Sequence, residues 1–278
     1  MLRRAPETIL VAHKMDPGRR ELYVEGVRDR VFIHWLTDGV RSPQASVIII
    51  DHVEVFGISE GGNRARLKHF LVEVANSGFE IKGLLDADHG RLLGETLPPN
   101  SWTTDLRDAE GYVLAPENID AALRLGCGIE RVEADTVRSH MELIALRLAG
   151  FRLASEFLTL ELPLSDLKLV RYVAGTPEGA LTLDEVKLRR VLLNKAGVPL
   201  SRESDFIAGM ESAARVISAQ PSDQVIHGKD CMKLLNIQFK ALGCDVNDVG
   251  ALLWSSFRRE RIGDFPVLSE VVEYMTKP

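Results

Sequence analysis

The sequence predicts an α/β fold in which a parallel sheet fills the N-terminal part and a mainly helical part follows. Two observations lead to this prediction. Before about residue 115, short apolar segments typical of buried strands alternate with segments whose apolar residues recur at helical spacing. From about Pro116 onward the helical spacing continues almost throughout. Because parallel strands need long connections, the alternation favours a parallel sheet, and we expect two domains, residues 1–115 and 116–278.

The elements of the first part follow in order. A short apolar strand is expected at 21–24, and Gly26 then turns the chain into an amphipathic helix over 27–36. A second strand, rich in β-branched residues, is expected at 45–51, and a second helix follows it and ends near Gly78. The third strand ends at Asp86, and GYVL at 111–114 is a candidate fourth strand. The stripe expected to face the core from the first helix contains Val27, Val31, Phe32, Trp35 and Leu36, and the stripe of the second contains Leu67, Phe70, Leu71 and Val74.

The second part carries clear helix signals. TLDEVKLRRVLLNKAG predicts a helix that begins with a capping box formed by Thr182 and Glu185 and ends at Gly197. Further helices are expected near 134–150, 203–219, 230–242, 247–259 and 267–275. We expect this part to provide a dimerisation surface or a surface for a partner protein.

Composition excludes several classes of protein. With 34 Lys and Arg against 40 Asp and Glu, the net charge is −6, which argues against a protein that coats nucleic acid by charge alone. No apolar run approaches the roughly 20 residues of a membrane span, and the N-terminus lacks a hydrophobic signal core, so a cytoplasmic protein without a membrane partner is expected. The three cysteines show no metal-binding spacing and are expected to be packing residues without a disulfide.

Three carboxylates follow the ends of two predicted strands. Glu25 comes directly after the first strand, and Asp86 and Asp88 follow the third. If these strands are neighbours, the three side chains share one crevice at the carboxyl edge of the sheet, with Asp86 and Asp88 on the same side of the extended chain. Carboxylate oxygens are the ligands preferred by Mg²⁺, and a cation would offset their mutual repulsion. On spacing alone, however, an Asp-x-Asp pair is more often a turn former or a helix cap.

The same residues carry a resemblance to a known family. VEG before a helix, followed later by LLDADHG, resembles the TOPRIM domain of topoisomerases, primases and nucleases of the overcoming-lysogenisation-defect type. APENID (115–120), VIHGKDCMKLL (225–235) and the closing RRERIGDFPVLSEVVEYM resemble a group of bacterial proteins with a TOPRIM-like core and a helical C-terminal part. The nuclease effectors of the PARIS anti-phage system, which work beside an ABC-type ATPase, belong to this group. The resemblance covers most of the chain, but only the acidic motifs and HGKD are specific.

The resemblance implies a Mg²⁺ site, with Mn²⁺ as an alternative ion. By its pattern, Glu25, Asp86 and Asp88 are metal ligands and handle the proton transfers of phosphodiester cleavage. Asp29 matches a further acid of the EGxxD pattern; it is either a metal ligand or a residue that favours the first turn of the following helix through the helix dipole. His89 and Lys229 are weaker candidates for contacts with substrate phosphates. The structural alternative for His89 is an exposed position in a loop. For HGKD (227–230), which contains Lys229, the structural alternative is that Asp230 caps a helix.

The resemblance also implies a function. We expect a Mg²⁺-dependent endonuclease that acts as a toxic effector in anti-phage defence, is controlled by an ABC-type ATPase partner and is a homodimer when active. RNA, in particular tRNA, is favoured as the substrate over DNA. Two alternatives stay open: a DNA endonuclease of the overcoming-lysogenisation-defect type, and a subunit that binds its partner without catalysing a reaction.

Overall fold

The computed structural model describes residues 3–58, 61–165, 167–246 and 248–277, which form two compact units. The first unit contains residues 3–105 together with 258–277, and the second contains residues 106–257. The expected boundary near residue 115 therefore lies at 105–106, and the C-terminal segment belongs to the N-terminal unit. The chain is mixed α/β, as the alternation of strands and helices predicted.

The first unit is built on a four-stranded sheet with the strand order β2-β1-β3-β4. All three strand pairs are parallel, with Val24 of β1 opposite both Ile49 of β2 and Leu84 of β3. The strands are β1 (Arg20–Val24), β2 (Ala45–Ile49), β3 (Ile81–Leu85) and β4 (Ser101–Thr103). The three strands predicted first are thus confirmed. GYVL is not the fourth strand: it forms a 3₁₀ helix (Ala109–Val113), because Asp108 caps that turn by accepting a hydrogen bond from Gly111 N–H.

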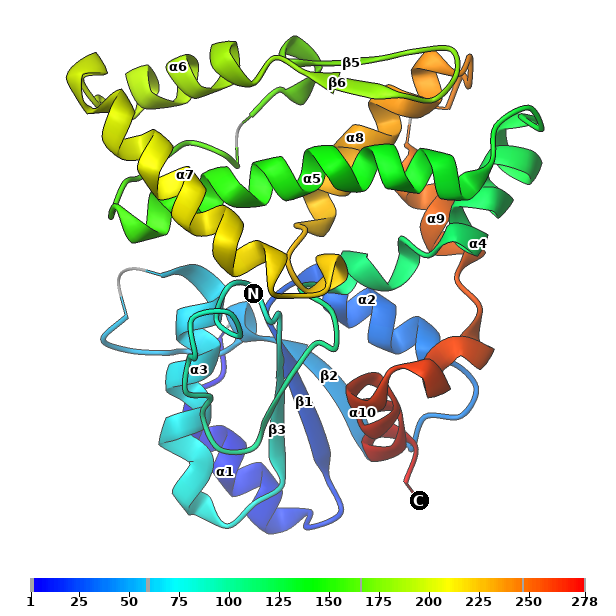
Figure 1. Cartoon of the computed structure of the whole chain (residues 1–278). Helices are drawn as coiled ribbons and strands as arrows, with labels where there is room; N and C mark the ends of the chain where they lie inside the picture. The colour runs from blue at the N-terminus through cyan, green and yellow to red at the C-terminus, as the bar shows by residue number, and fades with distance from the viewer. Residues whose placement is uncertain (1–2, 59–60, 166, 247, 278) are drawn as a thin grey trace. The chain divides into compact units, whose positions relative to one another are not determined.

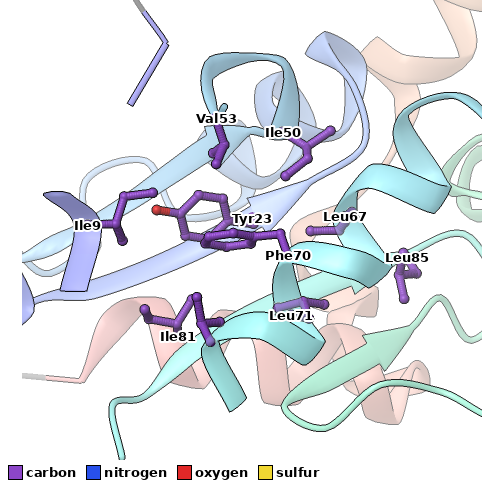
Figure 2. Close-up of a cluster of buried hydrophobic side chains, with 10 residues drawn as sticks. Ile9, Tyr23, Ile50, Val53, Leu67, Phe70, Leu71, Ile81 and Leu85 are labelled. Carbon is purple, nitrogen blue, oxygen red and sulfur yellow. The ribbon is translucent and has the colours of Figure 1, made fainter. Parts of the chain in front are cut away.

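Helices cover both faces of this sheet. In Figure 1, α1 (Pro6–Met15) and α3 (Gly62–Val74) lie on one side of the strands, and α2 (Val27–Leu36) and α10 (Pro266–Thr276) lie on the other. Figure 2 shows the core on the α1 and α3 side, where Tyr23 of β1 lies against Phe70 of α3 with ring centroids 4.6 Å apart. The full cluster contains Ile9, Tyr23, Ile50, Val53, Leu67, Phe70, Leu71, Val74, Ile81 and Leu85. The stripe predicted for α3 is therefore confirmed.

The stripe predicted for α2 is partly wrong. Val27 and Val31 are each 58% exposed, whereas Phe32, Ile33 and Leu36 are buried. Trp35 is half-buried, and the guanidinium of Arg259 lies over its ring at 4.9 Å. The buried face of α2 is thus rotated toward Ile33, since Ile33 and Leu36 are three residues apart and share a face of the helix.

The C-terminal helix α10 is fixed to the first unit by specific contacts. The carboxylate of Asp105 accepts hydrogen bonds from Val267 N–H (2.9 Å) and Leu268 N–H (3.0 Å) at the start of the helix. Farther along, Tyr274 donates its hydroxyl to the carbonyl of Glu80 at 2.6 Å. Capping and side-chain contacts therefore explain why a segment far away in sequence completes this unit.

Gly83 of β3 allows α3 to pack closely on the sheet. A Cβ atom at this position would lie 2.4 Å from Cδ1 of Leu71, a fully buried side chain. We expect Gly83→Ala to lower the free energy of unfolding by about 1 to 3 kcal/mol, because the core has no room for an extra methyl group. Urea denaturation would measure the effect. Gly263→Ala is the matched control because, among the residues that the structure describes, no atom lies within 4 Å of its added Cβ. Equal stability of the two variants would contradict close packing at Gly83.

The second unit is mainly helical, as predicted. The long helix α5 packs against α7 and α8, and a short antiparallel hairpin of β5 and β6 precedes α6. The elements are α4 (Pro116–Ala121), a π-helical turn (Ala122–Gly126), α5 (Ala134–Phe157), β5 (Val173–Gly175), β6 (Leu181–Leu183), α6 (Glu185–Lys195), α7 (Glu203–Ser218), α8 (Gly228–Ala241) and α9 (Val249–Ser256).

The start of α6 differs from the predicted capping box. Thr182 belongs to strand β6, and Asp184 is the N-cap, whose side chain accepts a hydrogen bond from Lys187 N–H at 3.0 Å. Asp184 takes this role because its carboxylate reaches the backbone N–H three residues later, the same spacing that was predicted for Thr182 and Glu185. The predicted glycine at the end of the helix is confirmed, since Gly197 has a left-handed φ of 68°.

The cysteines also differ from the expectation. Cys127 and Cys244 form a disulfide although 117 residues separate them, and Cys231 is free and buried. The sequence argument failed because it considered only local spacing, whereas folding brings the two residues to a Cα separation of 5.3 Å. We predict that peptide mapping without reductant recovers Cys127 and Cys244 in one linked peptide pair, and that Cys231 resists alkylation until the chain unfolds. Linkage of Cys231 to either partner would contradict this pairing.

A membrane-spanning helix is not found in the described part of the chain: no helix there is both long and apolar enough to cross a bilayer.

Candidate functional site

The strand order places a topological switch point between β1 and β3. From β1 the chain passes through α2 to β2 on one side, and from β2 it passes through α3 to β3 on the other side of β1. Ligands of parallel α/β sheets bind at the carboxyl ends of the strands at such a point. Glu25 follows β1 and Asp86 follows β3, so the condition for a shared crevice, that these strands are neighbours, is met.

Glu25 is fixed against the end of β3. Its Oε1 accepts a hydrogen bond from Asp86 N–H at 3.0 Å and lies 3.4 Å from Nη1 of Arg64. The side chain is 17% exposed. Burial is the largest influence and raises the pKa of Glu25 to about 7, helped by the negative charges of Asp88 and Asp29; Arg64 and the hydrogen bond from Asp86 oppose the rise. The raised pKa of Glu25 therefore comes mainly from burial, and Arg64 partly offsets it.

Asp86 and Asp88 leave the strand in different conformations. The extended chain ends near Asp86, and Asp88 lies in a turn with a left-handed φ of 45°. The alternation argument that put both side chains on one side therefore does not reach Asp88. The turn is anchored by Ala87, whose N–H donates to Thr104 Oγ1 at 3.0 Å. A non-glycine residue in this conformation is uncommon and costs about 1 kcal/mol or more, so the surrounding contacts hold Asp88 in place.

Arg64 places a guanidinium in this crevice. Besides Glu25, its Nη1 contacts the carbonyl oxygen of Asp86 and lies 3.6 Å from Oδ2 of Asp88. Its Nη2 donates to Oε2 of Glu95 at 2.7 Å, and Glu95 is also paired with Lys68 one turn along α3. Arg64 lies in the first turn of α3. Its guanidinium therefore contacts all three residues predicted to bind metal.

Asp29 has a structural role in this arrangement. Its Oδ2 accepts a hydrogen bond from Gly26 N–H at 2.9 Å, which fixes the first turn of α2. Asp29 also adds to the negative charge that Glu25 experiences. Asp29 thus acts at the start of the helix through a hydrogen bond. The effect through the helix dipole and a contact with metal both stay predictions.

His89 and Lys229 are the remaining predicted residues. His89 is buried, with 5% of its surface exposed, so the exposed loop position considered for it is wrong. Lys229 is exposed at the second position of α8, in the second unit. Contacts of either residue with a phosphate stay predictions.

The HGKD stretch has a structural explanation in the second unit. His227, not Asp230, is the N-cap of α8. The carboxylate of Asp230 is instead buried against Arg152, with two hydrogen bonds of 2.8 and 3.0 Å. Gly228 donates its N–H to Asp108 at 2.7 Å, and an added Cβ would lie 2.4 Å from that carboxylate. Burial and the nearby cations Arg152, Arg107, Lys229 and Lys233 lower the pKa of His227 to about 2, so His227 is neutral.

The donors at the switch point fit a hard divalent cation in kind. Glu25 and Asp88 supply carboxylate oxygens, and Asp86 supplies both a carboxylate and a carbonyl. The guanidinium of Arg64 contacts both Glu25 and Asp88 and the carbonyl of Asp86. Their present arrangement is not that of a formed metal centre: across residues 3–58, 61–165, 167–246 and 248–277 no three His, Cys, Asp or Glu side chains converge as a metal-binding group. The magnesium site therefore stays a prediction.

Comparison of the chain with protein-family models and with curated proteins finds no match.

Arg64, Glu95 and Thr104 were missed by sequence reasoning. The sequence does contain an indication for Arg64. The helix between the second and third strands of a parallel sheet begins at the edge where the strands end, so residues in its first turn lie near that edge. The GGNRAR segment places two arginines in the first turns of that helix, where the helix dipole disfavours cations. Cations at such a position indicate acidic neighbours. Glu95 and Thr104 carry no comparable signal, since their roles arise from the path of the loop.

Proposed function

We propose that this chain is a Mg²⁺-dependent endonuclease of the TOPRIM type. The observation that carries the proposal is the placement of a largely buried Glu25 beside Asp86 and Asp88 at the switch point between β1 and β3. Sequence resemblance supports the biological setting: a toxic effector of anti-phage defence, controlled by an ABC-type ATPase, dimeric when active and directed at tRNA rather than DNA.

Glu25, Asp86 and Asp88 would hold the Mg²⁺, or Mn²⁺ in its place. When bound, such an ion polarises a phosphoryl oxygen and lowers the pKa of a coordinated water or hydroxyl. The protein itself fixes Glu25 Oε1 through Asp86 N–H. In the part of the chain that the structure describes, Oε2 of Glu25 has no hydrogen-bond partner, so this oxygen is the one able to exchange a proton with a substrate. Thr104 holds the turn that presents Asp88.

A second candidate function is favoured by one observation. The carboxylates of Glu25 and Asp88 are paired with Arg64, a cation that could replace a metal ion in a crevice without catalytic activity. The chain would then be a partner-binding subunit of a defence complex without catalytic activity. Cleavage that depends on both metal and Glu25 would exclude this function.

The direct test incubates the purified chain with total tRNA and with plasmid DNA, each in Mg²⁺ and in EDTA. Discrete tRNA fragments that appear only with Mg²⁺ are the expected result. Cut plasmid with intact tRNA would change the substrate to DNA. No cleavage of either substrate, with the ABC-type ATPase partner added as a further arm, would favour the partner-binding subunit.

A further inference from the structure

Arg64 lies at an unusual place for a cation. It is the third residue of α3, whose first turn contains no acidic residue. The free N–H groups at a helix N-terminus carry partial positive charge, so an arginine there is disfavoured by its own helix. Its side chain is nevertheless 18% exposed and points to the carboxylates, which outweigh the dipole. The position of Arg64 is therefore determined by the acidic crevice.

The loop after β3 is shaped around Arg64. Gly90 leaves room for the pair of Arg64 and Glu95, since an added Cβ would lie 2.2 Å from Oε2 of Glu95 and 3.2 Å from Nη2 of Arg64. The loop is closed by Glu95 N–H, which donates to the carbonyl of Gly90 at 2.8 Å. Glu95 thus holds one end of the guanidinium while the other end contacts the predicted metal ligands.

A guanidinium and a divalent cation compete for the same oxygens. Nη1 of Arg64 contacts Glu25 Oε1, Asp88 Oδ2 and the carbonyl of Asp86. A Mg²⁺ or Mn²⁺ ion binds oxygen at roughly 2.1 Å and would be repelled strongly by a positive charge this close. The ion can therefore bind these ligands only after Nη1 has withdrawn. Nη2 already donates to Glu95, so the guanidinium keeps this partner when Nη1 leaves the carboxylates.

We infer that Arg64 is an internal counter-ion that holds the crevice in a state of weak metal affinity and must withdraw toward Glu95 before a divalent cation binds. Arg64 is accordingly a positioning residue that restrains the site. This inference rests on the proposed function, because it takes Glu25, Asp86 and Asp88 as the ligands of the ion.

Mn²⁺ titration by calorimetry tests the inference without any measurement of activity. Arg64→Gln is compared with the wild type, with Arg64→Lys and with Arg66→Gln. The last variant is the matched control: Arg66 lies on the same helix and loses the same charge, but it pairs with Asp51 at 2.6 Å. We expect Arg64→Gln to bind Mn²⁺ more tightly than the wild type, by about tenfold or more. Arg64→Lys should fall between the two, and Arg66→Gln should resemble the wild type. Circular dichroism shows whether each variant is folded. If Arg64→Gln does not fold, the Mn²⁺ affinity of Arg64→Lys is compared with that of the wild type instead.

Unchanged or weaker Mn²⁺ binding by both Arg64 variants would overturn the inference. If that binding is still abolished by Glu25→Gln, the metal site itself survives and only the role of Arg64 is wrong. If no variant binds Mn²⁺ through Glu25, both the role of Arg64 and the proposed function are wrong. Equal gains in Arg66→Gln and Arg64→Gln would show a general effect of charge and would likewise overturn the specific role.

Discussion

Glu25→Gln is expected to lower cleavage of the preferred nucleic acid by about 100-fold or more. The substitution keeps the shape of the side chain and its position beside Asp86, but it removes the negative charge and the ability to exchange a proton at Oε2. Loss of a positioned acid or base costs about 10²- to 10⁴-fold, and loss of a metal ligand adds to this. The measurement is the initial rate of tRNA cleavage in saturating Mg²⁺, accompanied by toxicity on expression in bacteria.

Glu73→Gln is the control for this experiment. Glu73 is an exposed glutamate on α3 and should retain wild-type activity. A thermal melt of each variant separates loss of chemistry from loss of fold. Activity within a few-fold of the wild type in Glu25→Gln would remove Glu25 from the mechanism, and with it the reason to regard this crevice as the catalytic site.

Glu21→Ala is expected to lower the free energy of unfolding by about 3 to 5 kcal/mol. Glu21 lies in β1 with none of its side chain exposed, and its carboxylate is held by Tyr23 at 2.5 Å, Arg19 at 2.5 Å and Arg4 at 3.0 Å. His13 completes the set at 3.4 Å. Removing one partner of a buried charged network leaves the others without compensation, which is among the most destabilising changes known for single residues. Urea denaturation at pH 7 measures the loss, and Glu80→Ala, an exposed acid beside β3, is the control.

The same network predicts how stability depends on pH. Burial raises the pKa of Glu21, but the hydrogen bonds from His13, Tyr23 and Arg19 and the charge of Arg4 outweigh it and lower the pKa from 4.5 to about 2. A lowered pKa in the folded chain means that the stabilisation is complete above about pH 4.5 and is lost as the pH falls toward 2. Between pH 4.5 and 2 the free energy of unfolding should therefore fall by about 3 kcal/mol less in Glu21→Gln than in the wild type. If the free energy of unfolding of the two proteins changes with pH in the same way, Glu21 does not have the lowered pKa.

Local patterns in the sequence predicted three of the four strands and placed the fourth wrongly at GYVL. β1, β2 and β3 are short apolar segments between turns, and α3 shows the regular spacing of Leu67, Phe70, Leu71 and Val74. The features that were missed depend on tertiary contacts. The return of α10 to the first unit depends on Asp105, and the disulfide joins residues 117 positions apart. Neither has a local signal.

The candidate site shows the same division. The juxtaposition of Glu25 with Asp86 followed from strand order and needed only that β1 and β3 be neighbours. The turn at Asp88 and the cation that occupies the crevice did not follow, because alternation applies only to extended chain and Arg64 reaches the site from another element. The acids in the sequence predicted negative charge in the crevice. The contact of Arg64 with these acids could be found only in the structure.

A crystal of the protein soaked in Mn²⁺ and measured for anomalous scattering tests the central claim most directly. The account predicts an anomalous peak at the switch point between β1 and β3, coordinated by Glu25 and at least one of Asp86 and Asp88 at roughly 2.1 Å, with Nη1 of Arg64 withdrawn from the carboxylates. A crevice without a peak at saturating Mn²⁺, in which Arg64 still contacts Glu25 and Asp88, would contradict the claim that these residues form a metal-dependent catalytic site.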